Sequence, residues 1–169
     1  MPYEMKAKGM EELSAMLNGM AEASEPAASR AVYKGAGIVA DEIKKGAESI
    51  RTAPFKFAPE GSTRLPSPEE KAVILAAGGA GIAKFDKNGS EVQTSVGYAK
   101  SGYALMAGRI KPIPQIANAI NSGTSFMPKQ PFVRKAARTG GKKAMEAMKE
   151  SIVADFEAAM KNKTGGNET

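Results

Sequence analysis

The sequence of 169 residues contains no cysteine, no histidine and no tryptophan. Without cysteine there is no disulfide framework, no thiolate zinc site and no thiol nucleophile. Without histidine the chain lacks the usual general base and the commonest metal ligand, and a Ser-His-Asp triad is excluded. Lysine or carboxylate chemistry stays open on composition alone, but these absences already favour a protein that is not an enzyme.

Long apolar runs are missing as well. The longest uncharged stretch, 112–128, contains three Pro, two Asn and a Gly, so it does not form a transmembrane helix. Residues 1–13 have acids close behind the first Lys and no apolar segment, which is unlike a secretory signal. We expect the protein to stay in the compartment where it is made and to have no membrane partner.

Aromatic residues make up only 6% of the chain, while alanine and methionine supply much of the 42% hydrophobic content. This composition is typical of helices that pack through small and flexible side chains. The length predicts a single domain, residues 1–163, followed by a polar tail, 164–169, that is expected to be disordered.

Hydrophobic periodicity predicts three helices of substantial length. The first covers about residues 10–23, and the second runs from Pro26, at a first-turn position, to about Ile50. The third covers about Gly141 to Lys161. Its apolar stripe is expected to face the core and consists of Met145, Met148, Ile152, Phe156 and Met160 (or Ala159).

The segments between these helices are shorter. Residues 51–66 are expected to form an extended loop, because proline is frequent and periodicity is lost. Ser67-Pro68-Glu69-Glu70 reads as a capping box that opens a short helix to about Ala77. We interpret Gly78-Gly79-Ala80-Gly81 as the stop of that helix, since a phosphate loop would lie between a strand and a helix.

Residues 81–98 predict a β-hairpin whose turn is Asp86-Lys87-Asn88-Gly89. Residues 103–106 predict a further strand or a helical turn. A short helix is expected around 113–120, with 121–123 as its end and an irregular link over 123–131. We infer an α+β fold in which a small antiparallel, hairpin-based sheet packs against a long helix in the N-terminal half and a long C-terminal helix.

No motif for catalysis or cofactor binding emerges. The acidic pairs 11–12 and 41–42 are typical of solvated helix faces. No calcium-loop spacing is present. We therefore expect no catalytic residue, no metal and no cofactor.

Basic residues are concentrated toward the C-terminus. Residues 129–163 contain nine Lys and Arg and four acids, within a chain of net charge +6. Such a concentration is typical either of contact with a nucleic-acid backbone or an acidic partner, or of a solvated helix start. We call six of these residues the basic cluster: Lys129, Arg134, Lys135, Arg138, Lys142 and Lys143. Phe132 is the only aromatic residue that lies between these basic residues in the sequence, so base stacking is not supported.

Residues Asn121–Ala136 read NSGTSFMPKQPFVRKA. This segment resembles the pattern Gly-Thr, Met-Pro and Gln-Pro-Phe-(Leu/Val)-Arg of the neck or tail-completion proteins of long-tailed bacteriophages, also described as head–tail joining proteins or minor tail components. The helix that opens at residues 9–13, the helix that runs through residues 36–42 and the closing helix agree with this family. The resemblance covers about Lys6 to Met160.

The resemblance implies a structural virion protein without enzymatic activity, located in the neck or tail and assembled in the host cytoplasm. Such subunits form a ring, expected to be a hexamer, between the connector or stopper and the tail terminator or tail tube. DNA passes through the lumen without sequence recognition. The alternative is a small basic nucleic-acid-binding protein, which the basic cluster alone supports.

Loops that carry exposed aromatic residues are typical interface anchors, although such residues also pack back onto their own domain. The candidate interface residues for a subunit or partner are Phe55, Phe57, Leu65, Gly123, Thr124 and Phe126. Phe132 is expected in the core. The basic cluster is the candidate surface for DNA or an acidic partner.

Overall fold

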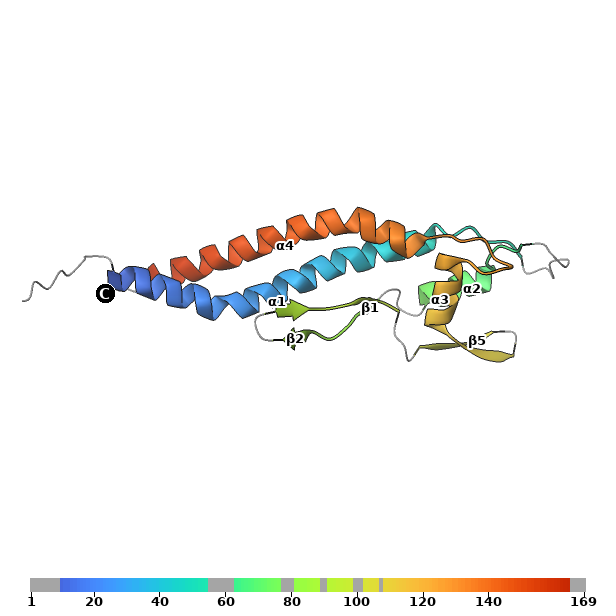
Figure 1. Ribbon diagram of the computed structural model, residues 1–169, viewed down its shortest axis with the longest axis horizontal. Helices are drawn as coiled ribbons and strands as arrows, with labels where there is room; N and C mark the ends of the chain where they lie inside the picture. The colour runs from blue at the N-terminus through green and yellow to red at the C-terminus, as the bar shows by residue number, and fades with distance from the viewer. Residues whose placement is uncertain are drawn as a thin grey trace, which may run out of the picture.

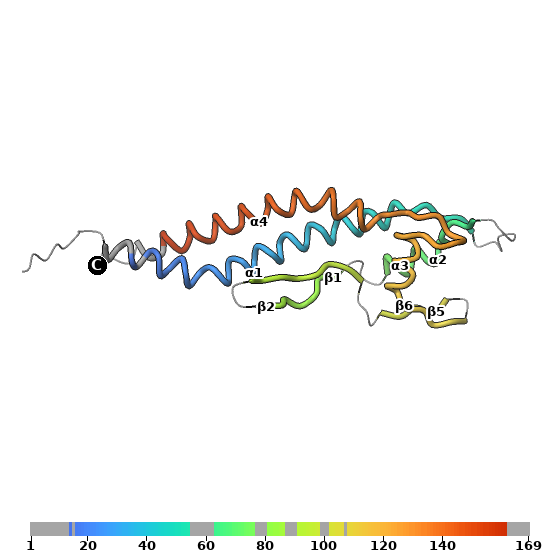
Figure 2. Tube along the Cα trace, viewed as in Figure 1, coloured from blue at the N-terminus to red at the C-terminus, as the bar shows by residue number. Residues whose placement is uncertain are grey.

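Two long helices lie side by side in opposite directions and set the length of the molecule (Figures 1 and 2). Helix α1 spans Met10–Glu48 and helix α4 spans Phe132–Thr164. The N-terminal end of α1 and the C-terminal end of α4 therefore lie at the same end of the molecule (Figure 2). The computed structural model describes residues 10–54, 63–76, 81–88, 91–98, 102–106 and 108–164.

Small residues allow α1 and α4 to approach closely. A Cβ atom on Gly35 would lie 2.8 Å from Cγ and Sδ of Met148, and one on Gly140 would lie 3.2 Å from Cγ of Glu42. Ala31, on the same helix as Gly35, is 1% exposed. Glycine lowers the intrinsic stability of a helix, but here it leaves room for side chains of the facing helix.

The expected break between two N-terminal helices is wrong, because α1 is continuous and Pro26 lies inside it. Proline removes a backbone hydrogen bond and clashes with the preceding turn, which is why the sequence favours a helix start there. Ala27 and Ala31 just beyond it are buried, and α1 packs along α4. This packing stabilises the helix across the position that its local sequence disfavours.

The closing helix begins nine residues earlier than expected, at Phe132, and runs through Gly140 and Gly141. Its expected core stripe is also wrong in part: Met145 is 57% exposed, and Ile152 is only half-buried. The buried face contains small residues instead, among them Ala136 and Ala144. Tertiary contact with α1 thus decides both the start of α4 and the face that it buries.

One antiparallel β-ribbon lies along α1 (Figure 1). Strands β1 (Gly81–Ile82) and β4 (Val96–Gly97) form its base, and β2 (Asp86–Asn88) and β3 (Glu91–Gln93) form its end. The ring of Phe85 lies 6.2 Å from that of Tyr33 on α1, which places the ribbon against the helix.

The pairing register changes by one residue along this ribbon, because Ala83–Phe85 faces only Thr94–Ser95. This is the arrangement of a β-bulge. The Ala83 N–H donates to the Ser95 carbonyl at 2.8 Å. The predicted turn position is wrong for Asp86, Lys87 and Asn88, which are paired with strand β3, and Gly89 lies outside the described residues.

The remaining elements gather at the opposite end of α1. Helix α2 spans Pro68–Ala76, as expected from the capping box, and helix α3 spans Ile113–Ser122. Residues 103–106 form a strand, β5 (Tyr103–Met106), which pairs with β6 (Arg109–Pro112). Of the expected helix stop at residues 78–81, Gly81 belongs to β1, and 78–80 lie outside the described residues.

The main core lies where the second half of α1 meets α2, α3, β5 and the start of α4. Phe132 is 4% exposed and its ring lies 6.4 Å from that of Tyr98, so its predicted core position is confirmed. The buried members of this core are Ile43, Ala47, Ile50, Ile74, Met106, Ile116, Ala117, Ile120, Met127, Phe132 and Ala136.

The α+β class with a long N-terminal and a long C-terminal helix is confirmed. The far half of the helical pair extends beyond the main core (Figure 1). Of the expected polar tail, Thr164 belongs to α4, and 165–169 lie outside the described residues.

Candidate functional site

The Gly-Thr part of the motif folds into a fixed turn after α3. Gly123 has a φ of 80° and donates its N–H to the Ala119 carbonyl at 2.9 Å, which ends the helix. A Cβ atom on Gly123 would lie 3.0 Å from the backbone nitrogen of Lys129. Both the positive φ and the lack of space therefore require glycine at this position. Thr124 and Met127 exchange backbone hydrogen bonds of 2.9 and 3.3 Å.

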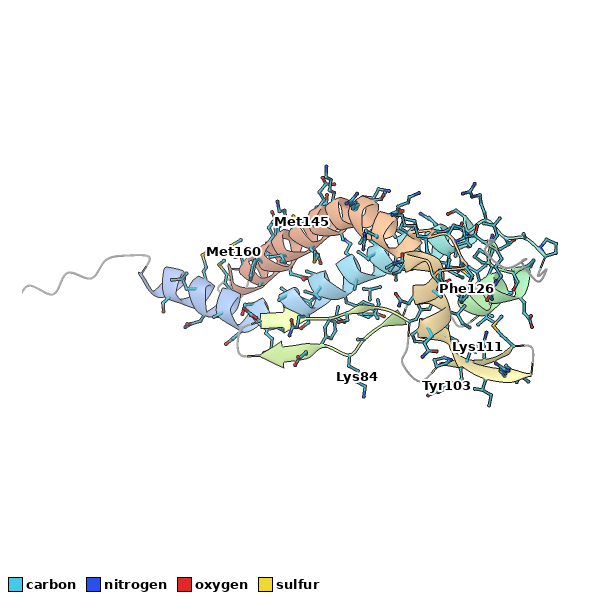
Figure 3. All side chains as sticks on the ribbon, turned by 45° about the vertical axis from the view of Figure 1, so that its right-hand side comes forward. Lys84, Tyr103, Lys111, Phe126, Met145 and Met160 are labelled. Atoms are coloured by element: carbon cyan, nitrogen blue, oxygen red, sulfur yellow. The ribbon has the colours of Figure 1, made fainter. Side chains whose placement is uncertain are left out.

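Phe126 lies at the tip of this turn and is 57% exposed (Figure 3). Thr124 is also exposed, whereas Gly123 is half-buried. Met127 anchors the turn to the main core, where its side chain is only 3% exposed. The turn therefore presents an aromatic side chain to solvent from a fixed backbone.

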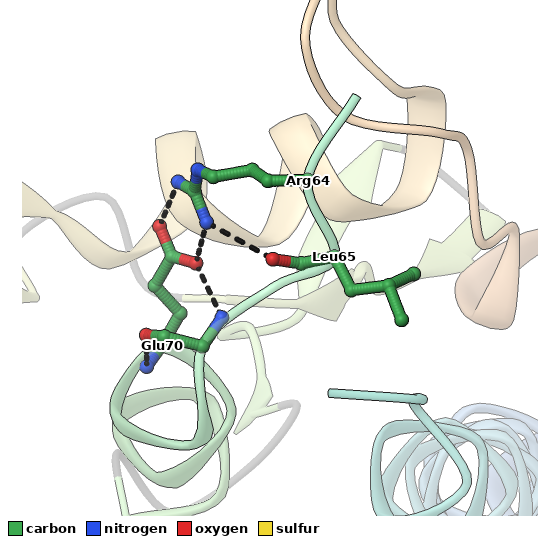
Figure 4. A network of polar contacts seen from close by, with 4 residues as sticks. Arg64, Leu65 and Glu70 are labelled. Carbon is green, nitrogen blue, oxygen red and sulfur yellow. Dashed lines mark hydrogen bonds and ion pairs between the residues drawn. The ribbon is translucent and has the colours of Figure 1, made fainter. Parts of the chain in front are cut away.

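Arg64 connects this turn to the start of α2 (Figure 4). Its backbone N–H donates to the Phe126 carbonyl at 2.8 Å. Its guanidinium donates two hydrogen bonds of 2.7 Å to the Glu70 carboxylate and one of 3.2 Å to the Leu65 carbonyl. A bidentate pair of this kind fixes orientation as well as distance.

Glu70 completes the capping box that the sequence predicts. The Glu70 N–H donates to Ser67 Oγ at 3.1 Å, and the Ser67 N–H donates to Glu70 Oε2 at 2.8 Å. Burial raises the pKa of Glu70, but the hydrogen bonds from Arg64 and Ser67 outweigh burial and hold that pKa below 4.5. The hydrogen bond to Glu70 in turn raises the pKa of Arg64.

A groove of about 260 Å³ lies beside Phe126. Ile116 and Ile120 of α3 supply apolar lining, Lys111 supplies positive charge, and the paired Arg64 and Glu70 also line the groove. Such a groove can accept an apolar side chain of a partner, with a carboxylate near Lys111.

The outer side of the β5–β6 hairpin is apolar and exposed, a feature that sequence reasoning missed. Leu105 and Ile110 are paired across the strands and are 70% and 73% exposed. Tyr103, two residues before Leu105 and therefore on the same side, is 62% exposed. The apolar run at 103–106 carries no signal that tells which of its sides is covered.

The other candidate interface residues give a mixed result. Leu65 is half-buried rather than fully exposed. Phe55 and Phe57 lie outside the described residues, so their interface role stays a prediction.

The basic cluster lies on the exposed surface of the first half of α4 and on the segment before it, and each of its six side chains is exposed. Lys143 lies 3.3 Å from the Glu42 carboxylate on α1. That hydrogen bond is the main reason why the pKa of Glu42 is lowered. Among the described residues, the other five members form no ion pair.

A second groove, of about 230 Å³, opens where α1 ends and α4 begins. Arg51, Lys129 and Lys135 contribute to its lining. The Gln130 side chain accepts from the Arg51 N–H at 2.9 Å and donates to the Arg51 carbonyl at 3.0 Å. The sequence did not identify Arg51 as a neighbour of the basic cluster, because the two are far apart along the chain. The hydrogen bonds between Arg51 and Gln130 bring Arg51 to the same groove as Lys129 and Lys135.

In the described part of the chain, no three acidic side chains are placed to hold a metal ion. None of the described helices combines the length and apolar character that crossing a membrane requires. No protein-family model, no curated protein and no solved structure matches this chain.

Proposed function

We propose that this protein is a structural virion subunit of a long-tailed bacteriophage. It forms a ring, expected to be a hexamer, at the head–tail junction, where it joins the connector or stopper to the tail terminator or tail tube and surrounds the DNA channel. The proposal starts from the resemblance of the segment Asn121–Ala136 to neck and tail-completion proteins. No enzymatic step belongs to this role.

The observation that carries the proposal is that this motif builds one rigid unit. Gly123 ends α3, Gln130 joins the end of α1 through Arg51, and the Asn121 side chain accepts from the Val133 N–H at 3.1 Å at the start of α4. The residues that carry the resemblance thus hold three helix ends together. The large apolar side chain that the unit leaves exposed is Phe126, at its tip.

Exposed apolar side chains on fixed elements also support a subunit rather than an isolated monomer. Phe126 and the outer side of the β5–β6 hairpin lie at the end of the molecule that holds the core. Exposed apolar side chains grouped as on the outer side of this hairpin typically mark a protein interface. A ring needs two different contact faces on each subunit, and an elongated subunit provides them.

The test is whether the full-length chain forms rings and where it lies in the virion. Negative-stain images of the purified chain should show rings, and gold-labelled antibody should mark the collar between capsid and tail. Phe126→Asp should abolish rings, whereas Ser125→Asp, at the neighbouring exposed position, is the matched control. A persistent monomer, or label elsewhere on the particle, would overturn the proposal.

The exposed basic cluster favours a second candidate function, a nucleic-acid-binding protein that acts as a monomer. Contact with phosphates makes affinity fall steeply with salt. A monomer that retards duplex DNA in a salt-dependent manner, without forming rings, would favour this candidate over the first.

A further inference from the structure

Charge is segregated along the helical pair. Residues 129–145 contain six cations and no acid, whereas 146–164 contain four acids and three cations. In α1, residues 10–29 contain four acids and no cation. Because the two helices are antiparallel, both acid-rich segments lie at the same end of the molecule (Figure 2).

We define the acidic half as residues 10–29 with 146–164, and the basic half as residues 30–51 with 129–145. The acidic half holds eight acids and three cations, a net charge of −5. The basic half holds eleven cations and three acids, a net charge of +8. The long axis of the subunit is therefore strongly dipolar.

Apolar surface is also exposed on α4, at the boundary between the two halves and within the acidic half. Met145 and Val153 are 57% and 55% exposed, and Ile152 and Phe156 are half-buried (Figure 3 labels Met145). At about 100° per residue these side chains share one side of the helix. Three exposed acids border this apolar stripe along one edge, Glu146, Glu150 and Glu157, and the exposed Lys149 lies within the stripe.

The same side of α4 is cationic in the basic half. Arg134, Arg138 and Lys142 follow one another at intervals of four residues, and Lys135 lies beside them. All four are exposed, and among the described residues none of them forms an ion pair. One continuous side of α4 thus changes from cations to an apolar stripe bordered by acids.

We infer that the basic half of one copy docks on the acidic half of the next copy in the ring. The aliphatic stems of Arg134, Arg138 and Lys142 cover the apolar stripe of the neighbour, while their charged groups reach its bordering acids. This inference rests on the proposed ring and adds the surfaces through which its subunits meet. The contact joins two different segments of α4, the basic segment of one copy and the acid-bordered segment of the next, and is therefore heterologous.

A second copy explains the surface better than a nucleic acid does. A nucleic acid uses only the basic half and is repelled by the acidic half, whereas a second copy uses both. The charges select the partner and its register, because complementary charge contributes to specificity and association rate more than to affinity. The exposed Met145 and Val153 supply apolar contact in the same interface.

The separation of the two surfaces also predicts an orientation. Arg138 and Glu150 are twelve residues apart, which corresponds to about 18 Å along a helix. Neighbouring copies are therefore shifted by about this distance along their helices. Subunits of a closed ring are not shifted along the ring axis, so the long helices must be inclined to the channel.

The test reverses charge in the full-length chain. The basic-reversal variant carries Arg134→Glu and Arg138→Glu, and the acid-reversal variant carries Glu146→Lys and Glu150→Lys. Sedimentation velocity at low salt should show each variant alone with self-association weakened about tenfold or more, because like charges then meet. Lys84→Glu, at an exposed position on the β-ribbon, is the control and should associate like the unmodified chain.

Complementation makes the experiment specific to contact between copies. An equimolar mixture of the two variants should associate again, and so should a single chain that carries all four substitutions. Raising the salt concentration should weaken association of the unmodified chain, since exposed charges are then screened. Circular dichroism checks that each variant remains folded.

Each other outcome overturns the inference in a recognisable way. If basic reversal leaves the rings intact, the surfaces are wrong but the ring proposal stands. If basic reversal dissociates the rings and neither the mixture nor the fourfold variant restores them, the basic half has another partner. Loss of a duplex DNA mobility shift in the basic-reversal variant would identify that partner as nucleic acid. An unmodified chain that stays monomeric at low salt contradicts the docking directly, while labelling of the virion still tests the location separately.

Discussion

Replacing Glu70 with alanine tests how the Phe126 turn is held. The Glu70 carboxylate accepts two hydrogen bonds from Arg64 and one from the Ser67 N–H. Arg64 in turn binds the Phe126 carbonyl through its backbone. The substitution therefore removes the helix cap of α2 and leaves the Arg64 guanidinium without its carboxylate.

The expected loss follows from burial. The side chains of Arg64 and Glu70 are 19% and 10% exposed. Removing one partner of a buried pair costs about 3–5 kcal/mol, and partial contact of Arg64 with water reduces this to about 2–3 kcal/mol. Ser67→Ala removes only the reciprocal capping bond and should cost about 1 kcal/mol.

Urea unfolding followed by circular dichroism measures these losses. The double variant with Arg64→Met and Glu70→Ala should lose at least about 1 kcal/mol less than the sum of the single variants, because the two residues act as a pair. In native-state hydrogen exchange, the Arg64 amide should exchange faster in Glu70→Ala, since its bond to Phe126 loses support.

The pH dependence has a definite sign. The pKa of Glu70 is lowered in the folded state, so its contribution is complete above pH 4.5 and declines as the pH falls toward the folded value. The stability gap between the unmodified chain and Glu70→Ala should therefore narrow below pH 4.5. A gap that does not change with pH, together with additive single losses, would refute this account of the network.

Three further predictions concern the backbone and the loop. Gly123→Ala should lower stability by about 1–3 kcal/mol in urea, because φ is 80° and the methyl group meets Lys129; unchanged stability would contradict the turn geometry. Pro26→Ala should raise the melting temperature, since alanine is favoured over proline by up to about 3 kcal/mol inside a helix; a lower melting temperature would show that α1 needs its proline. The pair Phe55→Ala and Phe57→Ala should leave the monomer folded by circular dichroism but abolish rings in negative stain, and intact rings would remove the 51–66 loop from the interface.

Elements with strong local signals could be predicted from the sequence. The Ser67–Glu70 capping box forms as expected, and α3 ends at Gly123 as its sequence indicates. The alternation of half-buried and exposed residues from Glu91 to Val96 also follows the predicted strand pattern. In each case the information lies within a few neighbouring residues.

Long-range packing decided the elements that sequence reasoning missed. Pro26 and Gly140 carry local signals against a helix, but both lie inside helices that pack against each other. The contact of Gly140 with Glu42 joins positions about a hundred residues apart in the chain. Periodicity in either segment alone does not contain this pairing.

The same limit applies to the candidate surfaces. The exposure of Phe126 and of the basic cluster agrees with the sequence-based hypotheses, because turns and charged helix faces are recognisable locally. The bidentate pairing of Arg64 with Glu70 and the approach of Arg51 to Lys129 depend on how the chain folds back. Interface function itself stays a proposal until rings are observed.

The main core lies at one end of the helical pair, and this position affects the local stability of the other end. Beyond the core, α1 and α4 form a two-helix arm that buries little more than its own seam, as the half-exposed Ile152 and the exposed Val153 show. Fraying from the tip of such an arm disrupts few contacts elsewhere, so local opening there is cheaper than global unfolding. A neighbour that covers the arm supplies the layer it lacks, and rigidity at the tip then becomes a property of the assembly.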